Sequence, residues 1–393
     1  MRWLIGFSFV GETGQAPLPV ALKCANGERV KVRGENWVRG GYRPLRKWPP
    51  LTSTLSSQAG SGSNSTLRAA RPILVSMAAA LAVLITSDTA LADDTAAPTP
   101  AATEALVTNQ VSDSLSFVDL ATFKSVAEIK IGGKPAGIAV SPDRLRAYLT
   151  SPDGKTVTVV DTKARAVLRR ITVEGGPLGI AAHPSNGLIY VADWYSKRLT
   201  AIDPESGATR GQIDVGSSPS GIAVTPDGAF VLTADRDSNQ VSIVDAATFK
   251  PVAAIPVGTR PFGISLDPSG TRAFTANVGS DDVTVIDLKT RKVAGRVAAG
   301  HHPYTVAFAG GHGFVTNQSG GTVTVFDAAT LAVEKTIEVG DTPEGIAADP
   351  SGRFVYVACW FENALDRIDV ATLSVTGQAT VGDGPRSFGS FLR

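Results

Sequence analysis

The chain has 393 residues, and its 37 Lys and Arg nearly balance its 36 Asp and Glu, which gives a formal net charge of +1. Residues 1–92 hold eleven of the basic residues and four of the acidic ones, so residues 93–393 carry 26 against 32, a net charge of about −6. A globally acidic domain is a poor general binder of polyanions, which argues against non-specific nucleic-acid binding as its main function.

The first 66 residues show no internal repeat and no sustained hydrophobic period. They contain scattered tryptophans and arginines and a stretch rich in Ser and Gly from 53 to 65. We expect residues 1–66 to be either sequence upstream of a true start near Leu67 or a small disordered extension.

Residues 67–92 have the three parts of a secretory signal peptide. Two arginines provide the positive flank, residues 73–85 form the apolar core, and Ala90-Leu91-Ala92 has the small-x-small pattern of a cleavage site. The core is shorter than the stretch of about 20 apolar residues that spans a membrane. Cleavage would leave Asp93 at the mature N-terminus, so we expect a periplasmic or secreted protein without a membrane span.

Residues 93–104 are rich in Ala, Thr and Pro, which indicates a flexible lead into the folded domain. Cys24 lies before the predicted cleavage site, and Cys359 is then the one cysteine of residues 93–393. One cysteine forms no internal disulfide, so we expect packing and closure to hold the domain together.

Two markers repeat along residues 105–393 with the same spacing. One is a proline, at successive intervals of 42, 42, 42, 42, 40 and 42 residues, and the other is an aspartate with the same six intervals. The prolines are Pro135, Pro177, Pro219, Pro261, Pro303, Pro343 and Pro385, and the aspartates are Asp119, Asp161, Asp203, Asp245, Asp287, Asp327 and Asp369. A period of about 40–45 residues built from short strands is typical of a β-propeller blade, as in WD40-like repeats.

The unit after Pro219 shows what one repeat contains. Four short apolar or alternating runs cover residues 221–224, 230–234, 241–244 and 252–257, and residues with turn chemistry separate them. This pattern predicts four antiparallel strands and no helix, so the fold class is all-β.

The two ends of residues 105–393 predict how the ring closes. Three strands are expected before Pro135, at 105–109, 114–118 and 126–131, and one is expected after Pro385, at 387–392. Three N-terminal strands and one C-terminal strand together complete a seventh blade, which leaves no open sheet edge between first and last blades. We therefore predict a seven-bladed β-propeller of four-stranded antiparallel blades over residues 105–393.

The repeat resembles the YVTN family of β-propeller repeats, which includes the YncE-like proteins of the bacterial periplasm. The Tyr-Val-Thr-Asn strand of that family is matched by Leu106-Val107-Thr108-Asn109 and Phe314-Val315-Thr316-Asn317, with looser forms in the other units. The segment from Gly216 to Ala223 matches the Gly-x-x-Pro-x-Gly-Ile-Ala element. The resemblance implies the fold but no particular activity, because propellers host many unrelated functions.

Internal repetition separates scaffold from candidate site. Whatever recurs in all seven units belongs to the blade, so we interpret the seven aspartates as turn residues that bond backbone amides, not as a metal or acid–base array. Functional residues are expected among positions that differ between units and share one face of the ring.

The loop from a fourth strand into the next first strand lies on the same face of a propeller as the loop between second and third strands. Both sets surround the mouth of the central channel, a common place for ligands. The candidate ligand-binding residues on these loops are Lys134, Trp194, Tyr195, Arg236, Arg260, Phe262, His301, His302, Tyr304, Glu344, Trp360, Phe361 and Arg386. Trp194 and Trp360 occupy the same place in their units, and their alternative role is packing between neighbouring blades.

Catalytic and cofactor signatures are scarce. The chain has no Gly-x-Ser-x-Gly elbow, no phosphate-binding loop and no Cys-x-x-Cys-His haem attachment, so we expect no cofactor. His301 and His302 raise a metal hypothesis that Asp341 and Glu344 could complete, but adjacent residues of an extended loop point in different directions. We favour a loop without a metal.

The favoured function is that of an exported, non-enzymatic propeller that binds a protein, a peptide or a small ligand through the loops around its channel. Two alternatives stay open. One is a lactonase-like hydrolase or lyase that uses His301, His302 or Glu344 at the channel mouth. The other is a single-stranded nucleic-acid binder, in which the aromatic residues stack on bases and the cations hold phosphates. That role would use Trp194, Tyr195, Trp360, Phe361, Arg236, Arg260, Arg386 and Lys134.

Overall fold

The computed structural model describes residues 102–393. The expectations for residues 1–66 and 67–92, and most of the predicted lead at 93–104, lie outside the described residues. Among the described residues, no helix has the length and apolar character that crossing a membrane requires.

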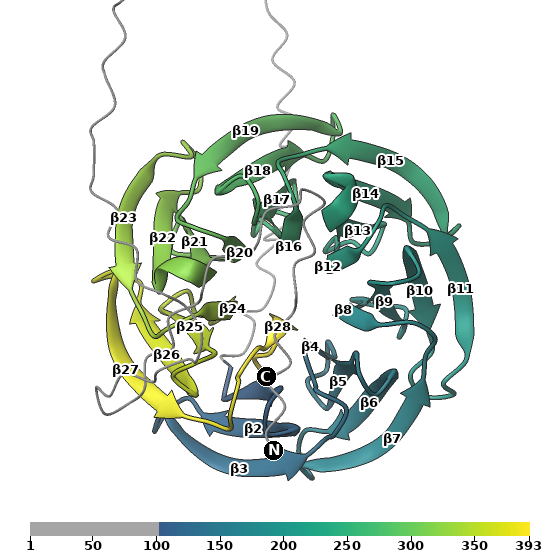
Figure 1. The fold of residues 1–393 in the computed structure, drawn as a ribbon, viewed down its shortest axis with the longest axis horizontal. Coiled ribbons are helices and arrows are strands. Elements are labelled where there is room, and N and C mark those ends of the chain that lie inside the picture. Colours follow the sequence, from purple (N-terminus) through teal and green to yellow (C-terminus); the bar gives the residue numbers. More distant parts are fainter. Residues whose placement is uncertain (1–101) are drawn as a thin grey trace, which may run out of the picture. The chain divides into compact units, whose positions relative to one another are not determined.

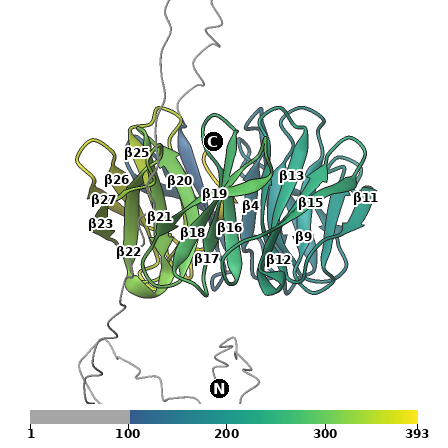
Figure 2. The same ribbon diagram turned by 90° about the horizontal axis from the view of Figure 1, so that it is seen from above.

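The described residues form a ring of seven sheets, as predicted (Figure 1). Each blade runs from an inner strand beside the central axis to an outer strand at the periphery, and the strands within a blade are antiparallel neighbours. Figure 2 turns the ring by 90° and shows the strands running between two opposite faces that carry the connecting loops.

Six blades are continuous in sequence. Blade 1 contains β4 (Gly137–Val140), β5 (Arg146–Ser151), β6 (Thr156–Asp161) and β7 (Ala166–Thr172). Blade 2 contains β8 (Pro177–Ala182), β9 (Ile189–Asp193), β10 (Arg198–Ile202) and β11 (Thr209–Asp214). Blade 3 contains β12 (Pro219–Val224), β13 (Phe230–Asp235), the short 3-10 helix η1 (Arg236–Ser238), β14 (Gln240–Asp245) and β15 (Lys250–Pro256).

The next three blades repeat this order. Blade 4 contains β16 (Pro261–Leu266), β17 (Arg272–Asn277), β18 (Asp282–Asp287) and β19 (Lys292–Ala298). Blade 5 contains β20 (Pro303–Ala309), β21 (His312–Asn317), the 3-10 helix η2 (Gln318–Gly320), β22 (Thr322–Asp327) and β23 (Val333–Glu338). Blade 6 contains β24 (Pro343–Ala348), β25 (Phe354–Cys359), β26 (Ala364–Asp369) and β27 (Ser374–Thr380).

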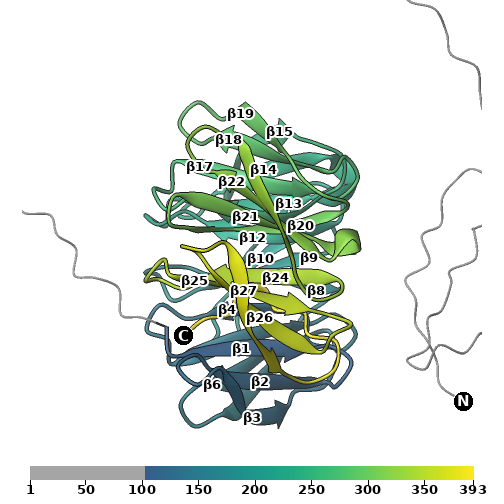
Figure 3. The same cartoon turned by 90° about the vertical axis from the view of Figure 1, so that its left-hand side faces the viewer.

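Blade 7 joins the two ends of the described chain. Its N-terminal part is β1 (Glu104–Asn109), β2 (Ser114–Asp119) and β3 (Lys124–Lys130), and the C-terminal segment that includes β28 (Phe388–Ser390) lies inside β1. Figure 3 shows β1 to β3 beside β26 and β27 of blade 6, which places the first and last parts of the propeller next to each other.

Residue type explains the gradient from inner to outer strands. The middle strands are rich in β-branched residues and are buried on both faces, as in β18, because neighbouring blades cover each side. The outer strands are mostly exposed because they lie at the periphery of the ring; in β7, Val167 is partly buried, Ile171 is buried and the other residues are exposed.

The recurring aspartates hold turns, as predicted. Asp245 accepts hydrogen bonds from the backbone N–H and the hydroxyl of Thr248, at 2.7 and 2.8 Å, and Phe249 follows with a φ of 52°. These bonds from Thr248 lower the pKa of Asp245, because they stabilise the carboxylate. The same turn occurs at Asp119, Asp287 and Asp327.

The Thr and Asn of the Tyr-Val-Thr-Asn strand also have structural roles. The Thr316 hydroxyl donates to the Glu344 carbonyl of the next blade at 2.8 Å, so it links two blades. Asn317 donates to hydroxyls of β22 and accepts the N–H of Gly300 at 2.9 Å, so it joins its own blade to the preceding loop. Cys359 replaces this asparagine in blade 6 and is buried.

The C-terminal segment closes the ring as predicted, by bonding to β1 of blade 7, but its strand β28 belongs to the sheet of blade 1. The N–H of Arg386 donates to Thr108 of β1, and the N–H of Leu106 donates to Phe391, both at 2.8 Å. Between these contacts β28 pairs in parallel with β4. At Gly389 the φ is 130°, and an added Cβ would lie 2.3 Å from the Ile138 carbonyl oxygen, so glycine permits this approach to blade 1.

Candidate functional site at the channel mouth

The two predicted sets of loops lie on one face and bond to each other. The N–H of Trp360 donates to the Thr342 carbonyl at 3.0 Å, and the N–H of Gln318 donates to the His302 carbonyl at 3.0 Å. Each pair joins the loop between the second and third strands of a blade to the loop that enters the inner strand of the same blade. We call the surface that these two sets of loops form the mouth face.

Immediately below the mouth face, side chains fill the channel. They include the residues that follow each repeating proline together with Phe388 of β28, and most of them are buried. The ring centroids of Phe262 and Tyr304 lie 4.4 Å apart, and that of Phe388 lies 5.0 Å from Phe262 and 5.5 Å from Tyr304. We call this layer the channel plug; its members are Ala136, Leu178, Ser220, Phe262, Tyr304, Glu344, Arg386 and Phe388.

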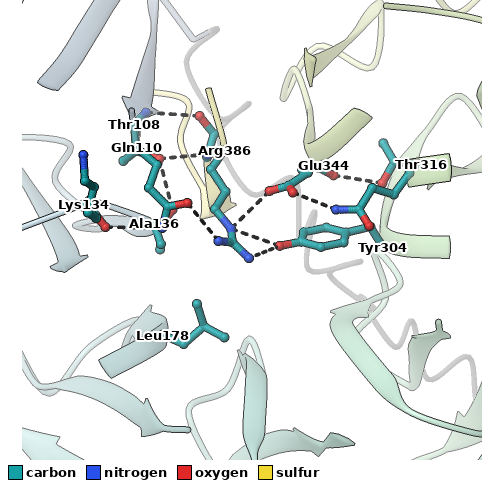
Figure 4. A network of polar contacts seen from close by, with 12 residues as sticks. Thr108, Gln110, Lys134, Ala136, Leu178, Tyr304, Thr316, Glu344 and Arg386 are labelled. Atoms are coloured by element: carbon teal, nitrogen blue, oxygen red, sulfur yellow. Dashed lines mark hydrogen bonds and ion pairs between the residues drawn. The ribbon is translucent and has the colours of Figure 1, made fainter. Parts of the chain in front are cut away.

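The polar half of the plug is centred on Arg386 (Figure 4). Its Nε lies 3.1 Å from Glu344 Oε2, and its Nη2 donates to the Tyr304 hydroxyl at 2.7 Å. Its Nη1 donates to the side-chain carbonyl of Gln110 at 3.2 Å. Gln318 donates to the other Glu344 oxygen at 2.7 Å. The guanidinium therefore contacts residues of blades 5, 6 and 7, and these contacts hold it inside the plug.

Burial governs the titration of this group of side chains. Burial raises the pKa of Glu344, and the charge of Arg386 opposes this increase without reversing it. Burial also raises the pKa of Tyr304, which keeps the phenol neutral. Burial disfavours the charge of Arg386, yet Tyr304 and Glu344 hold the pKa of Arg386 above its usual range. Arg386 therefore stays positively charged inside the plug.

Trp194 packs on the plug, whereas its neighbour Tyr195 faces solvent. The Trp194 ring lies 5.9 Å from that of Phe262, and the Arg236 guanidinium lies 5.4 Å above Trp194. Tyr195 is 70% exposed. The packing interpretation of Trp194 thus has direct support, and Tyr195 is the exposed member of this pair.

Trp360 and Phe361 form a second aromatic pair in blade 6. An added Cβ at Gly384 would lie 3.2 Å from Trp360 Cζ2 and 2.6 Å from a Val111 methyl group, so these two side chains flank Gly384. Phe361 is 69% exposed and Val111 is 53% exposed. The sequence analysis missed Val111, although it stands two residues after Asn109, as Phe361 stands two residues after Cys359.

The candidate cations differ in their exposure and in the ion pairs that they form. Arg386 is buried in the plug, whereas Arg260 is exposed. Lys134 forms an ion pair of 3.5 Å with Asp113, and Arg236 forms one of 2.7 Å with the neighbouring Asp237. A phosphate-binding role for Arg386 would require breaking its contact with Glu344.

The two adjacent histidines have separate partners. His301 Nδ1 lies 2.8 Å from an Asp281 carboxylate oxygen, and His302 Nδ1 lies 2.5 Å from the Ser319 hydroxyl. Glu344 instead contacts Arg386 in the plug. Over residues 102–393 no three His, Cys, Asp or Glu side chains come together as a metal site would require.

Comparison with known proteins agrees with the fold. Residues 92–186 match the sequence model of the YNCE-like beta-propeller family. The chain is a β-propeller whose residues 92–186 resemble that family in sequence. No curated protein matches the sequence.

Solved structures of similar fold include proteins with different names. A Kuenenia stuttgartiensis hydrazine synthase is 20% identical, with a TM-score of 0.59 over 64% of this chain and 88% of that one. A protein of unknown function from Desulfotomaculum acetoxidans DSM 771 is 17% identical, with a TM-score of 0.63 over 72% and 99%. The dihydro-heme d1 dehydrogenase NirN, solved in complex with DHE, is 14% identical, with a TM-score of 0.55 over 73% and 74%. At these identities the similarity shows the fold alone.

Proposed function

We propose that this propeller is an exported, non-enzymatic protein that binds a partner on its mouth face. The observation that carries the proposal is the exposure of Tyr195 and Phe361, which lie on that face in separate blades. Large aromatic side chains at turns lose contact with water when a partner covers them, and such residues supply much of the binding energy in interfaces.

The plug favours binding on the face over binding inside the channel. Phe262, Tyr304 and Phe388 fill the channel with packed rings, so a partner at this end meets a closed floor. Loops around such a floor form a broad surface, which suits a polypeptide better than a small enclosed ligand.

The polar contacts support a binding role over catalysis. A hydrolytic site needs several titratable groups directed at one point, whereas His301, His302 and Glu344 are each bonded to a different neighbour. Glu344 is also buried against Arg386, which removes it from contact with a substrate on the face.

Export rests on the signal-peptide pattern of residues 67–92. The check is to express the chain from Leu67 in a bacterium, fractionate the cells and determine the mature N-terminus by mass spectrometry. Trimming to Asp93 in the periplasm is expected. Uncleaved protein in the cytoplasm would contradict export.

A pair of surface variants tests the binding face. Tyr195→Ala combined with Phe361→Ala should leave the melting temperature within a few degrees of the original, because both side chains are exposed. The same change should reduce recovery of partners cross-linked in envelope extract, quantified by mass spectrometry. Leu168→Ala is the control, because Leu168 is an exposed apolar residue on outer strand β7. Equal recovery by all three proteins would reject the proposal.

A further inference from the structure

Val111 of blade 7 and Trp360 and Phe361 of blade 6 form an apolar patch on the mouth face. Val111 and Trp360 flank Gly384, and Phe361 follows Trp360 in the same turn. Phe361 and Val111 are each more than half exposed, and Trp360 is half-buried. We call these three residues the Phe361 patch.

Carboxylates surround this patch. The Asp383 carbonyl accepts the N–H of Val111 at 3.1 Å, the Asp341 carbonyl accepts the N–H of Phe361 at 3.3 Å, and Glu362 is the next residue in the chain. All three acidic residues are exposed. Within residues 102–393 none of their carboxylates forms an ion pair, although the Thr342 hydroxyl donates to Asp341 Oδ1 at 3.0 Å.

Nearby basic residues leave this acidic character in place. Lys134 is paired with Asp113, as described above. Lys134 Nζ also lies 3.5 Å from the carbonyl oxygen of Val111, and Lys130 donates to the carbonyl of Ser112 at 3.1 Å. Against these two lysines stand Asp113 and the three exposed acidic residues, Asp341, Glu362 and Asp383, so the net charge around the patch is negative.

The second aromatic pair has a different setting. Trp194 lies under the guanidinium of Arg236, and Lys197 is exposed two residues after Tyr195. Arg236 is itself paired with Asp237, so the Trp194–Tyr195 pair has charges of both signs beside it, whereas exposed acidic residues adjoin the Phe361 patch. Such a difference in charge is a basis for selectivity between partners.

We propose that the Phe361 patch docks a cationic segment of a polypeptide, one in which Lys or Arg side chains flank an apolar or aromatic residue. This inference rests on the proposed binding function of the mouth face. The apolar residue of the partner would cover Val111 and Phe361, and its cations would meet Asp341, Glu362 and Asp383. Arg suits such a site because its guanidinium stacks on aromatic rings and forks onto carboxylates.

Charge favours this occupant over nucleic acid. Phosphates approaching Phe361 would meet three unpaired carboxylates, which repel them, whereas a basic peptide gains from the same field. Residues 93–393 as a whole carry a net charge of about −6, which also steers a cationic partner toward the protein.

Fluorescence anisotropy with defined probes tests the proposal on the protein comprising residues 93–393. The probes are a labelled hexapeptide of alternating Arg and Trp, a matching hexapeptide of Glu and Trp, and a labelled 15-nucleotide oligothymidine. We expect the Arg–Trp peptide to bind at 50 mM salt and the other two to bind at least about tenfold more weakly.

Variants test whether the Arg–Trp peptide binds at this patch. Asp341→Asn, Glu362→Gln and Asp383→Asn combined should weaken the Arg–Trp peptide roughly tenfold, and Phe361→Ala should weaken it about fivefold. Asp153→Asn is the matched control, because Asp153 is an exposed acid at the blade 1 position equivalent to Phe361. Melting curves show whether each variant is folded.

Three results would overturn the inference. They are unchanged peptide affinity in the triple carboxylate variant, an equal loss with Asp153→Asn, and preferential binding of the oligothymidine. If Phe361→Ala reduces capture of native partners while the carboxylate variant retains them, the face binds partners but the charge assignment is wrong. These experiments can therefore reject the proposed class of partner without rejecting the proposed function.

Discussion

The guanidinium of Arg386 lies 3.1 Å from the carboxylate of Glu344, with both side chains largely buried in the channel plug. Arg386 belongs to the C-terminal segment that completes blade 7, and Glu344 is the second residue of β24, the inner strand of blade 6. The pair therefore connects the closing segment to the neighbouring blade at the centre of the ring.

Replacing Arg386 with Met should destabilise the propeller strongly. The change leaves the buried Glu344 carboxylate without its cation, for which losses of about 3–5 kcal/mol are typical. We expect the melting temperature in neutral buffer to fall by roughly 10 °C.

Two controls interpret that result. Arg210→Met removes an exposed partner of Asp203 and should leave the melting temperature nearly unchanged. Combining Arg386→Met with Glu344→Leu should recover part of the loss, because no unpaired charge then stays buried. A double variant less stable than Arg386→Met alone would contradict this explanation.

Glu344→Gln should change how stability depends on pH. Burial raises the pKa of Glu344 in the folded protein, so the folded state holds this proton more tightly than the unfolded chain does. The stability that Glu344 contributes is then fully present below its unfolded pKa of about 4.3 and is lost as pH rises through the folded pKa. Gln is neutral throughout and shows no such loss.

Melting curves of both proteins between about pH 4 and pH 8 give the comparison. The melting temperature of Glu344→Gln minus that of the original protein should increase with pH. A difference that decreases with pH would mean that Arg386 lowers the pKa of Glu344 more than burial raises it.

Gly389→Ala should weaken ring closure. The new methyl group would lie 2.3 Å from the Ile138 carbonyl oxygen, so β28 must move away from β4. We expect a loss of about 2 kcal/mol or more, measured by chemical denaturation. Gly187→Ala is the matched control, because Gly187 also has a positive φ but nothing within 4 Å of an added Cβ. Equal losses would show that backbone strain alone is responsible.

Trp194→Ala and Trp360→Ala should have different effects. Trp194 packs between Phe262 and the Arg236 guanidinium, so its removal should destabilise the protein by about 2–4 kcal/mol. Trp360→Ala should cost roughly 1–2 kcal/mol and weaken partner binding by about 1 kcal/mol or more. Thermal melting and cross-linking recovery check the two effects. Trp194→Phe, which keeps an aromatic ring, should be milder than Trp194→Ala, and equal stability losses at Trp194 and Trp360 would contradict the assignment.

The architecture could be predicted because each blade satisfies local rules. The interval between prolines and the Asp245-to-Thr248 turn recur in every unit with minor changes, and a four-stranded antiparallel sheet forms through contacts close in sequence. Counting the strands at the two ends of the chain predicted that three N-terminal strands and one C-terminal strand would close the ring. The count did not predict that the C-terminal strand would pair with blade 1 through Gly389.

The channel plug needed the tertiary structure. Phe262, Tyr304, Glu344 and Arg386 occupy the same place in different repeats, and the sequence indicated only that they share a face. Whether they open toward solvent or pack against one another depends on the width of the channel and on Phe388, which a different strand supplies. The sequence alone therefore determined the repeat, the blade count and the face that varies, because these depend on local order along the chain. The ring in three dimensions decided which varying residues are buried, because burial depends on side chains from several blades meeting at one axis.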